Sequence, residues 1–391
     1  MPHSALIEKM AGFAQTHVRP RPELGTRDEF PHDIWAAMGE QGLLDPCRMV
    51  AGRWGPVPAI TGGGRALAAS GGNLGLALSW MIHHLVAGVL LKPCLDDPDG
   101  NNVPGKALHK PGLWNRIRRG KSTVALAVSE PEAGAHPKFM TANAEKTAQG
   151  FRVSGEKTHV TNGPVADAFV VIAVTGQAGP KKQFSAFLVD RDCPGLEVSG
   201  PMAIPFFKPA PHAGLSLDGC CLDQTRCLGT EGAAFPDMVL PFRRLEDAVM
   251  TGPVTGAMMF ILDALAQHMS RSQGDSPEQD AALGNLWALT ETAVYLSGQM
   301  AGMADRECRS IGSFLSDASL FEAMLLYFRQ MAAQYLDGLS RLLSETGVSL
   351  DSPADILVRD LESSSRLGEK TARLRSGKLG RLLLMNTSHK F

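Results

Sequence analysis

Two segments near the middle of the chain place hydroxyl, carboxyl and amide side chains at the ends of predicted strands. The first, ALAVSEPEAGAHP at residues 125–137, ends an apolar strand with Ser129 and Glu130 before a turn rich in Pro and Gly. The second, VSGEKTHVTNG at residues 153–163, ends in a polar group that begins at Thr161. Hydroxyl and backbone N–H donors can stabilise negative charge on a group bound in a dry pocket. Each segment alone is typical of an ordinary hairpin, but together and in this order they are the most specific feature of the sequence.

Other chemistries find little support in the sequence. There is no Ser/His/Asp order, phosphate-binding loop or metal motif. The seven cysteines form no CxxC pair and no zinc-type spacing, which indicates reduced thiols in a cytosolic setting. Cys220 and Cys221 are expected to face opposite sides of one strand rather than to form a redox couple. Lys and Arg number 38 against 40 Asp and Glu, a formal charge of −2, so nothing indicates a nucleic-acid partner.

The N-terminal residues lack the basic and apolar regions of a signal peptide, so we expect a cytoplasmic location. The longest apolar stretch, around residues 74–91, contains His83 and His84 in tandem and several glycines. We expect this stretch to be a buried helix rather than a membrane span, with both histidines satisfied inside the core.

The two polar segments need a β domain to position them, and the sequence places that domain between helical regions. Apolar residues recur at helical spacing before residue 121 and again after residue 240, whereas short β-rich runs separated by Gly, Pro and Asp lie between. The length of 391 residues also predicts more than one domain. We therefore expect an α+β multidomain protein, with an N-terminal α-helical domain at 1–121, a middle β-barrel domain at 122–239 and a C-terminal helical bundle at 240–391.

In these two segments the sequence resembles the acyl-CoA dehydrogenase family. The middle domain of that family carries a T/S-E-P-x-A-G-S turn and, later, a G-x-K segment that ends in Thr or Ser followed by Asn-Gly. Weaker similarities extend over nearly the whole chain, including LGTEG at residues 228–232 and the pair Arg359-Asp360. The resemblance implies the family's fold and an FAD whose ring lies between the β domain and the C-terminal helices. It also implies the family's reaction, in which a carboxylate removes the α-proton of an acyl thioester while the β-hydrogen leaves as hydride.

The resemblance further implies which residues contact the flavin ring. One segment would line its pyrimidine edge, where Ser129 offers a hydroxyl group, and the other would cover the opposite side, with Thr161 near N5. His159 stands where most members have Trp or another aromatic residue. The implied contacts are Leu126, Ala127, Val128 and Ser129 in the first segment, and His159, Val160 and Thr161 in the second.

On the adenosine side of FAD the sequence departs from the family. Arg271 stands where members reach the cofactor of a neighbouring subunit, but the usual Phe after it is missing. In the family's glycine-rich loop, Arg341 replaces the glutamine, Ser344 and Glu345 replace the paired glycines, and Gly347 is the last glycine. Because a Cβ atom obstructs the close approach that glycine permits, we expect FAD to be held more weakly than in a standard member.

The base is also displaced from its usual place. When Gly368 is aligned with the glycine that follows the family's late Glu, Leu367 occupies the position of the base, and an ungapped count puts Gly368 there instead. In the isovaleryl and long-chain branches the base lies earlier, and alignment with that branch puts Glu246 in this position. The alternative is that Glu246 is a solvated helix residue. Substrate contacts are implied at Ala135, Arg244, Asp247 and Gly368, the last through a backbone N–H near the thioester oxygen.

The resemblance implies partners as well as a reaction. The substrate would be an acyl thioester of CoA or of an acyl carrier protein, and the electrons would pass to an electron-transferring flavoprotein. A homodimer or homotetramer is expected. Two alternatives remain open, namely the same fold with monooxygenase or thioester-reductase chemistry, and a non-catalytic member whose cofactor site has decayed.

Overall fold

The structure is a computed structural model, and it describes residues 3–45, 57–91, 112–271, 276–309 and 318–387. The chain forms two compact units, each assembled from separate segments. The first unit comprises residues 1–26, 57–77 and 247–391, and the second comprises residues 27–56 and 78–246. The described elements follow the expected order of helices, strands and helices, while the bounds of the three expected domains stay a prediction.

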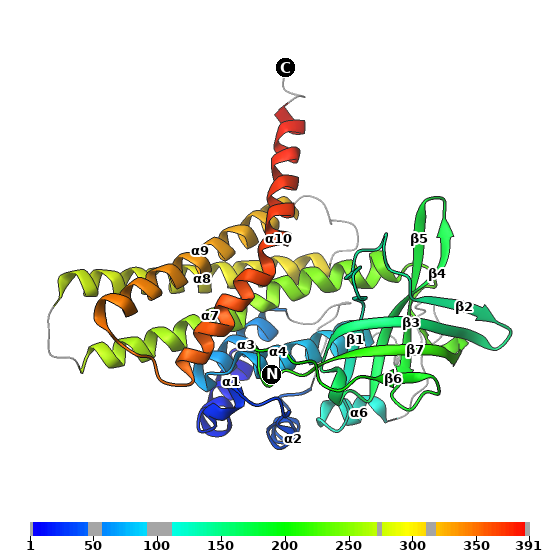
Figure 1. Cartoon of the computed structure of the whole chain (residues 1–391), viewed down its shortest axis with the longest axis horizontal. Coiled ribbons are helices and arrows are strands. Elements are labelled where there is room, and N and C mark those ends of the chain that lie inside the picture. The colour runs from blue at the N-terminus through cyan, green and yellow to red at the C-terminus, as the bar shows by residue number, and fades with distance from the viewer. Residues whose placement is uncertain (1–2, 46–56, 92–111, 272–275, 310–317, 388–391) are drawn as a thin grey trace. The chain divides into compact units, whose positions relative to one another are not determined.

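The second unit contains all the strands of the described chain, drawn mainly in green in Figure 1. They form one eight-stranded sheet in the order β6-β7-β3-β2-β4-β5-β8, with β1 added in parallel beside β4. Strands β6 and β8 each pair with one neighbour, so the hydrogen-bonded path is open between them. The strands are β1 (Val124–Ala127), β2 (Asn143–Thr147), β3 (Gly150–Thr161), β4 (Ala168–Ala178), β5 (Lys181–Asp190), β6 (Leu196–Val198), β7 (His212–Asp223) and β8 (Cys227–Leu228).

Alternation along the strands produces the core of this sheet. Side chains of successive residues point to opposite faces, so the apolar set of each strand gathers on one side. Phe151, Phe169 and Phe187 are fully or almost fully buried in the resulting cluster. Cys220 is buried in the same cluster while Cys221 is exposed, which confirms that the adjacent cysteines face opposite ways.

The second unit also holds short helices that flank the sheet residues in sequence. They are α2 (His32–Glu40), α6 (Leu113–Arg118), the 3-10 turns η3 (Gly163–Val165) and η4 (Gln224–Arg226), and the π-helical segments η2 (Leu85–Leu91) and η5 (Phe235–Val239). Helix α4 (Leu74–His84) runs directly into η2, and η5 runs directly into α7 (Leu240–Met269). π-helical turns are rare and occur frequently at functional sites, so η5 indicates a functional site near the start of α7.

The first unit is helical. It contains α1 (His3–His17), η1 (Pro22–Gly25), α3 (Val57–Gly71), most of α7, and the three long helices α8 (Pro277–Arg309), α9 (Ala318–Thr346) and α10 (Ala354–Thr387). Helix α8 packs along α9, and α9 packs against α10, drawn in orange and red in Figure 1. A Cβ atom on Gly252 would lie 2.1 Å from the carbonyl oxygen of Thr61, so this glycine allows α7 to cross α3 closely.

One helix among the described residues, Phe235–Met269, is long and apolar enough to cross a membrane. Of its most apolar stretch, 78% is buried in the structure. Burial of this extent is what the core helix of a packed bundle shows.

The tandem histidines lie at the end of α4 and are fully buried, as expected from the sequence. Nε2 of His83 lies 3.2 Å from the carbonyl oxygen of Leu44, and Nε2 of His84 lies 3.0 Å from that of Leu43. A carbonyl oxygen only accepts hydrogen bonds, so each ring carries its hydrogen on Nε2. Burial lowers the pKa of His83 to about 4 and that of His84 to about 3, so both rings are neutral at pH 7.

We expect the free energy of unfolding to fall when the pH is lowered from 7 to 5. The pKa values in the folded protein, about 4 for His83 and about 3 for His84, lie below the ordinary value of 6.5. The stability that depends on both rings being neutral is therefore fully present above pH 6.5. It is lost as the pH falls toward the folded values, by about 2 kcal/mol for each histidine at pH 5. Urea unfolding at the two pH values measures this loss. In the His83→Leu/His84→Leu variant the pH dependence should shrink, and an unchanged dependence would assign the effect to other groups.

Candidate functional site

A recess in the second unit brings the two polar segments together. One wall comes from the end of β1 and the turn after it, a second comes from the end of β3, and a third comes from η5 and the start of α7. Half of the lining residues are apolar, and the other half carry hydroxyl, imidazole, guanidinium and carboxyl groups. The lining residues are Ile82, Leu126, Val128, Ser129, Ala135, Thr158, His159, Thr161, Val239, Phe242, Arg243 and Glu246.

A β-bulge shapes the wall that β3 provides. Lys157 pairs with Leu215 and Val160 pairs with Ala213, so Thr158 and His159 together oppose the single residue Gly214. Neighbouring residues of a regular strand face opposite sides, whereas a bulge redirects side chains and is common beside active sites. Both bulged residues therefore line the recess.

The bulge is fixed by specific contacts. His159 has a φ of +53°, in the left-handed region that non-glycine residues seldom adopt. Nδ1 of His159 lies 3.1 Å from Oγ1 of Thr158, and the backbone N–H of Thr158 donates to the carbonyl oxygen of Ser129 at 2.8 Å. The last bond joins the two polar segments directly.

A buried ion pair lies behind these two walls. Nζ of Lys157 is 2.8 Å from Oε1 of Glu130, and the two side chains are 0% and 4% exposed. Lys157 also donates to the carbonyl oxygen of Val128 at 3.2 Å, while Oε2 of Glu130 accepts from the backbone N–H of Thr141 at 2.6 Å. Both charges thus have several partners, and the pair holds the end of β1 against β3.

The pKa values of the pair reflect its burial and its contacts. Burial lowers the pKa of Lys157, partly offset by the hydrogen bond to Glu130. For Glu130 burial acts to raise the pKa, but the hydrogen bonds from Lys157 and from backbone N–H groups outweigh it and lower the pKa. Both residues belong to the two motifs, yet their pairing could not be seen in the sequence.

The start of α7 is tied to the turn that follows β1. The guanidinium group of Arg243 donates to the carbonyl oxygen of Ala135 and lies 5.6 Å from the ring centroid of Phe235. Glu246 is three residues further along the helix, so it lies on the same face as Arg243 and is half-buried in the recess. The contact of Arg243 with Ala135 was not expected from the sequence.

The recess gathers seven of the residues expected at the site. The exceptions in the flavin set are Ala127 and Val160, which are buried in the core cluster of the sheet. Arg244 is half-buried on α7 and does not line the recess. The seven residues that line it are Leu126, Val128, Ser129, Ala135, His159, Thr161 and Glu246.

Three expected residues lie in the first unit. Asp247 forms ion pairs with Arg375 and, at 4.0 Å, with Arg329, so its carboxylate joins α7 to the long helices of that unit. Arg271 is exposed in the turn after α7, and its N–H donates to the carbonyl oxygen of His268 at 3.2 Å. The roles expected for Asp247 in substrate binding and for Arg271 at a subunit boundary stay predictions.

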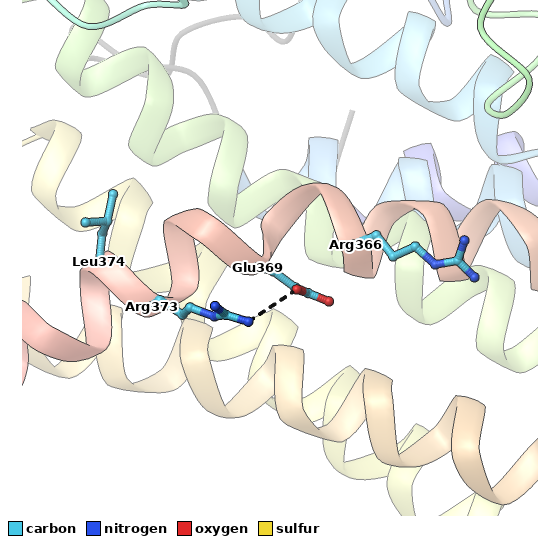
Figure 2. A pocket seen from close by; sticks show the side chains of 4 residues that line it. All are labelled: Arg366, Glu369, Arg373 and Leu374. Carbon is cyan, nitrogen blue, oxygen red and sulfur yellow. Dashed lines mark ion pairs between the residues drawn. The ribbon is translucent and has the colours of Figure 1, made fainter.

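Gly368 is the third of these residues, and its expected role in substrate binding stays a prediction. It lies inside α10, which continues as one helix from Ala354 to Thr387. A mid-helix N–H normally donates to the carbonyl group four residues earlier, so the expected contact with a thioester oxygen would need a different backbone at this residue. Figure 2 shows this part of α10, where Glu369 faces away from the helix axis and pairs with Arg373 at 3.7 Å. The side chain of Glu369 is 63% exposed, so the carboxylate nearest to the family's late base in sequence is a surface group.

The expected glycine-rich loop is also helical. Arg341, Ser344 and Glu345 lie in the last turns of α9, which ends at Thr346. Gly347 follows with a φ of +67°, and its N–H donates to the carbonyl oxygen of Leu343 at 3.0 Å. This is the usual way in which glycine ends a helix.

Comparison with known proteins agrees with this architecture. The sequence profile of the acyl-CoA dehydrogenase middle domain matches residues 125–220. Over 390 residues the chain is 25% identical to a mitochondrial isovaleryl-CoA dehydrogenase of Oryza sativa subsp. japonica, covering 96% of this chain and 90% of the relative. It is 27% identical over 270 residues to the benzylmalonyl-CoA dehydrogenase of Aromatoleum aromaticum, covering 67% of each chain.

The chain is also similar to a carrier-protein dehydrogenase and to a solved structure that contains FAD. An L-prolyl-[peptidyl-carrier protein] dehydrogenase of a Serratia species is 32% identical over 114 residues, covering 29% of this chain and 30% of the relative. The solved structure of PigA in complex with FAD superposes with a TM-score of 0.80 at 17% identity and covers 98% of both chains.

The α+β architecture, with its mixed sheet and long helices, is the fold of the acyl-CoA dehydrogenases. The motif-bearing strands that carry the recess lie within the segment that matches the middle-domain profile. The chain belongs to the acyl-CoA dehydrogenase family.

Proposed function

We propose that the protein catalyses the FAD-dependent α,β-dehydrogenation of an acyl thioester. The observation that carries this proposal is the recess itself, in which the two motif segments meet Glu246. The relatives named above as CoA dehydrogenases support the same reaction.

The residues of the recess fit a flavin ring. Such a ring is flat and largely apolar, with polar atoms along one edge, and sites for such groups combine apolar walls with a few placed donors. Leu126, Val128 and Phe242 supply apolar surface, while the hydroxyl groups of Ser129 and Thr161 supply donors. The FAD bound by PigA, which has the same fold, supports FAD as the cofactor. When bound, FAD supplies a two-electron acceptor for the hydride.

Glu246 is proposed as the general base. Its carboxylate would take the α-proton of the thioester, the electrons of that C–H bond would form the new C=C bond, and the β-hydrogen would leave with its electron pair. Ser129 and Thr161 would orient the acceptor, and the apolar lining would exclude water from the reacting atoms. Arg243, which is bonded to Ala135, would position the first turns of α7 and hence Glu246.

The acyl group could be carried by CoA or by a carrier protein, and the electrons need an acceptor protein. The name of the Serratia relative supports a carrier-protein thioester, and the names of the other two relatives support CoA. We further propose a cytoplasmic homo-oligomer that passes electrons to an electron-transferring flavoprotein, on the family resemblance of the sequence.

A cofactor titration tests the function. We expect the purified protein to bind one FAD per chain and to show a flavin spectrum. Retention should be weaker than in a standard member, because Arg341, Ser344 and Glu345 replace the residues of the family's glycine-rich loop. Anaerobic addition of a suitable acyl thioester should bleach that spectrum as hydride is transferred. A protein that gains no flavin absorbance at excess FAD would instead support the non-catalytic alternative. Rapid reaction of the reduced protein with oxygen would favour the monooxygenase alternative.

A further inference from the structure

A cluster of buried polar groups lies beside the recess in the second unit, and it is separate from the residues that line the recess. Four of its side-chain atoms have no hydrogen-bond partner among the described residues. Their side chains belong to residues that are at most 3% exposed. The atoms are Oγ of Ser79, Nδ1 of His83, Oδ1 of Asn162 and Nε1 of Trp35.

Contacts join the four residues into one cluster. Nδ2 of Asn162 donates to the backbone carbonyl oxygen of Ser79 at 3.0 Å. Ser79 and His83 are four residues apart on α4, so their side chains lie on the same face of the helix. The rings of His83 and Trp35 meet edge to face, with their centroids 5.3 Å apart.

The hydrogen-bonding roles of the four atoms are complementary. His83 carries its hydrogen on Nε2, so Nδ1 is an acceptor, and the amide nitrogen of Asn162 is the donor to Ser79, so Oδ1 is an acceptor. The indole N–H of Trp35 is a donor, and the hydroxyl group of Ser79, which can donate or accept, is available as a second donor. The cluster thus contains two donors and two acceptors that the protein atoms described leave unpaired.

Leaving such groups unpaired inside a protein is costly, at roughly 1–3 kcal/mol for each. A water molecule donates two hydrogen bonds and accepts two, and buried waters typically satisfy such groups. We propose that Ser79, His83, Asn162 and Trp35 form a buried hydration site, in which ordered water joins the two donors to the two acceptors.

The hydration site would act as a support for the recess. Asn162 has a φ of +63°, and it directly follows Thr161, which lines the recess. On the other side, Ile82 of α4 lines the recess while its neighbour His83 belongs to the cluster. Water bound between these residues would hold the corner at Thr161 and Asn162 against α4.

The direction in which one substitution changes the thermal midpoint tests the proposal. Ser79→Ala removes the hydroxyl group but keeps the backbone carbonyl that accepts from Asn162. If water is bound, the substitution removes a hydrogen bond and should lower the thermal midpoint by about 2 °C. If the hydroxyl group is unpaired, its removal should leave the midpoint unchanged or raise it, which would overturn the proposal.

Ser185→Ala is the matched control in the same unit. Its hydroxyl group is equally buried but has direct partners, Oγ1 of Thr175 and the N–H of Gly232, both at 2.8 Å. This substitution should lower the midpoint whether or not water occupies the cluster, so it shows that the assay resolves the loss of one buried hydrogen bond.

A crystal structure of the full chain at about 1.5 Å resolution provides the direct test. We expect a density peak about 2.7–3.2 Å from Oγ of Ser79 and from Nδ1 of His83 or Oδ1 of Asn162. Direct bonding of the Ser79 hydroxyl group to a protein atom, with no such peak, would overturn the proposal. Neither measurement depends on FAD or on turnover, so failure of the proposed function would leave this test intact.

Discussion

Replacement of Glu246 by Gln should abolish most of the turnover with an acyl thioester. Gln keeps nearly the same size and shape but cannot accept the α-proton, and loss of a positioned general base typically lowers the rate by about 10²–10⁴-fold. The flavin spectrum of the variant should stay normal, because the wall formed by β1 and β3 is untouched. Stopped-flow bleaching of the bound flavin under anaerobic conditions measures the chemical step directly.

Glu369→Gln is the matched control for this variant. It makes the same chemical change on another helix, at a side chain that is 63% exposed and paired with Arg373. We expect it to retain the wild-type rate. The opposite pattern would return the base to the late segment of the chain, and full activity in both variants would remove the proposed mechanism.

Replacement of Lys157 by Met should lower the free energy of unfolding by about 3–5 kcal/mol. The substitution leaves the carboxylate of Glu130 buried without its opposite charge, since the remaining backbone and hydroxyl donors do not neutralise it. Chemical unfolding followed by near-ultraviolet and far-ultraviolet circular dichroism measures the loss. The Lys157→Met/Glu130→Gln variant should recover part of it, because Gln carries no charge.

The exposed pair Lys146 and Glu231 supplies a control with the same chemistry. Its Nζ to Oε2 distance is 3.0 Å, close to that of the buried pair, but the two side chains are 62% and 38% exposed. Exposed ion pairs contribute about 0–1 kcal/mol, so Lys146→Met should change stability little. Equal losses for the two lysine variants would show that burial does not decide the effect.

The sequence by itself determined the local features of the protein. Strand ends marked by Ser129 and Thr161 were visible because polar residues and turn formers interrupt apolar β-rich runs. Cys220 and Cys221 were placed correctly for the same reason, since adjacent strand residues face opposite ways. The fold class followed from the order of helical and β-rich regions together with the motifs.

Only the tertiary structure decided which distant residues meet. The bulge at Thr158 and His159 depends on the pairing of β3 with β7, and strand register is a property of two strands rather than one. Likewise, the ion pair of Lys157 with Glu130 and the bond from Arg243 to Ala135 join residues far apart in the chain.

The late segment around Gly368 also shows that alignment does not determine the local backbone. Alignment placed Gly368 on the glycine that follows the family's late Glu, and the structure continues as a helix through it. A glycine inside a helix costs only about 1 kcal/mol, which the surrounding good helix formers can offset. Motif spacing therefore identified the family and the polar strand ends, whereas the balance of helix propensity, packing and burial decided the backbone that carries each residue.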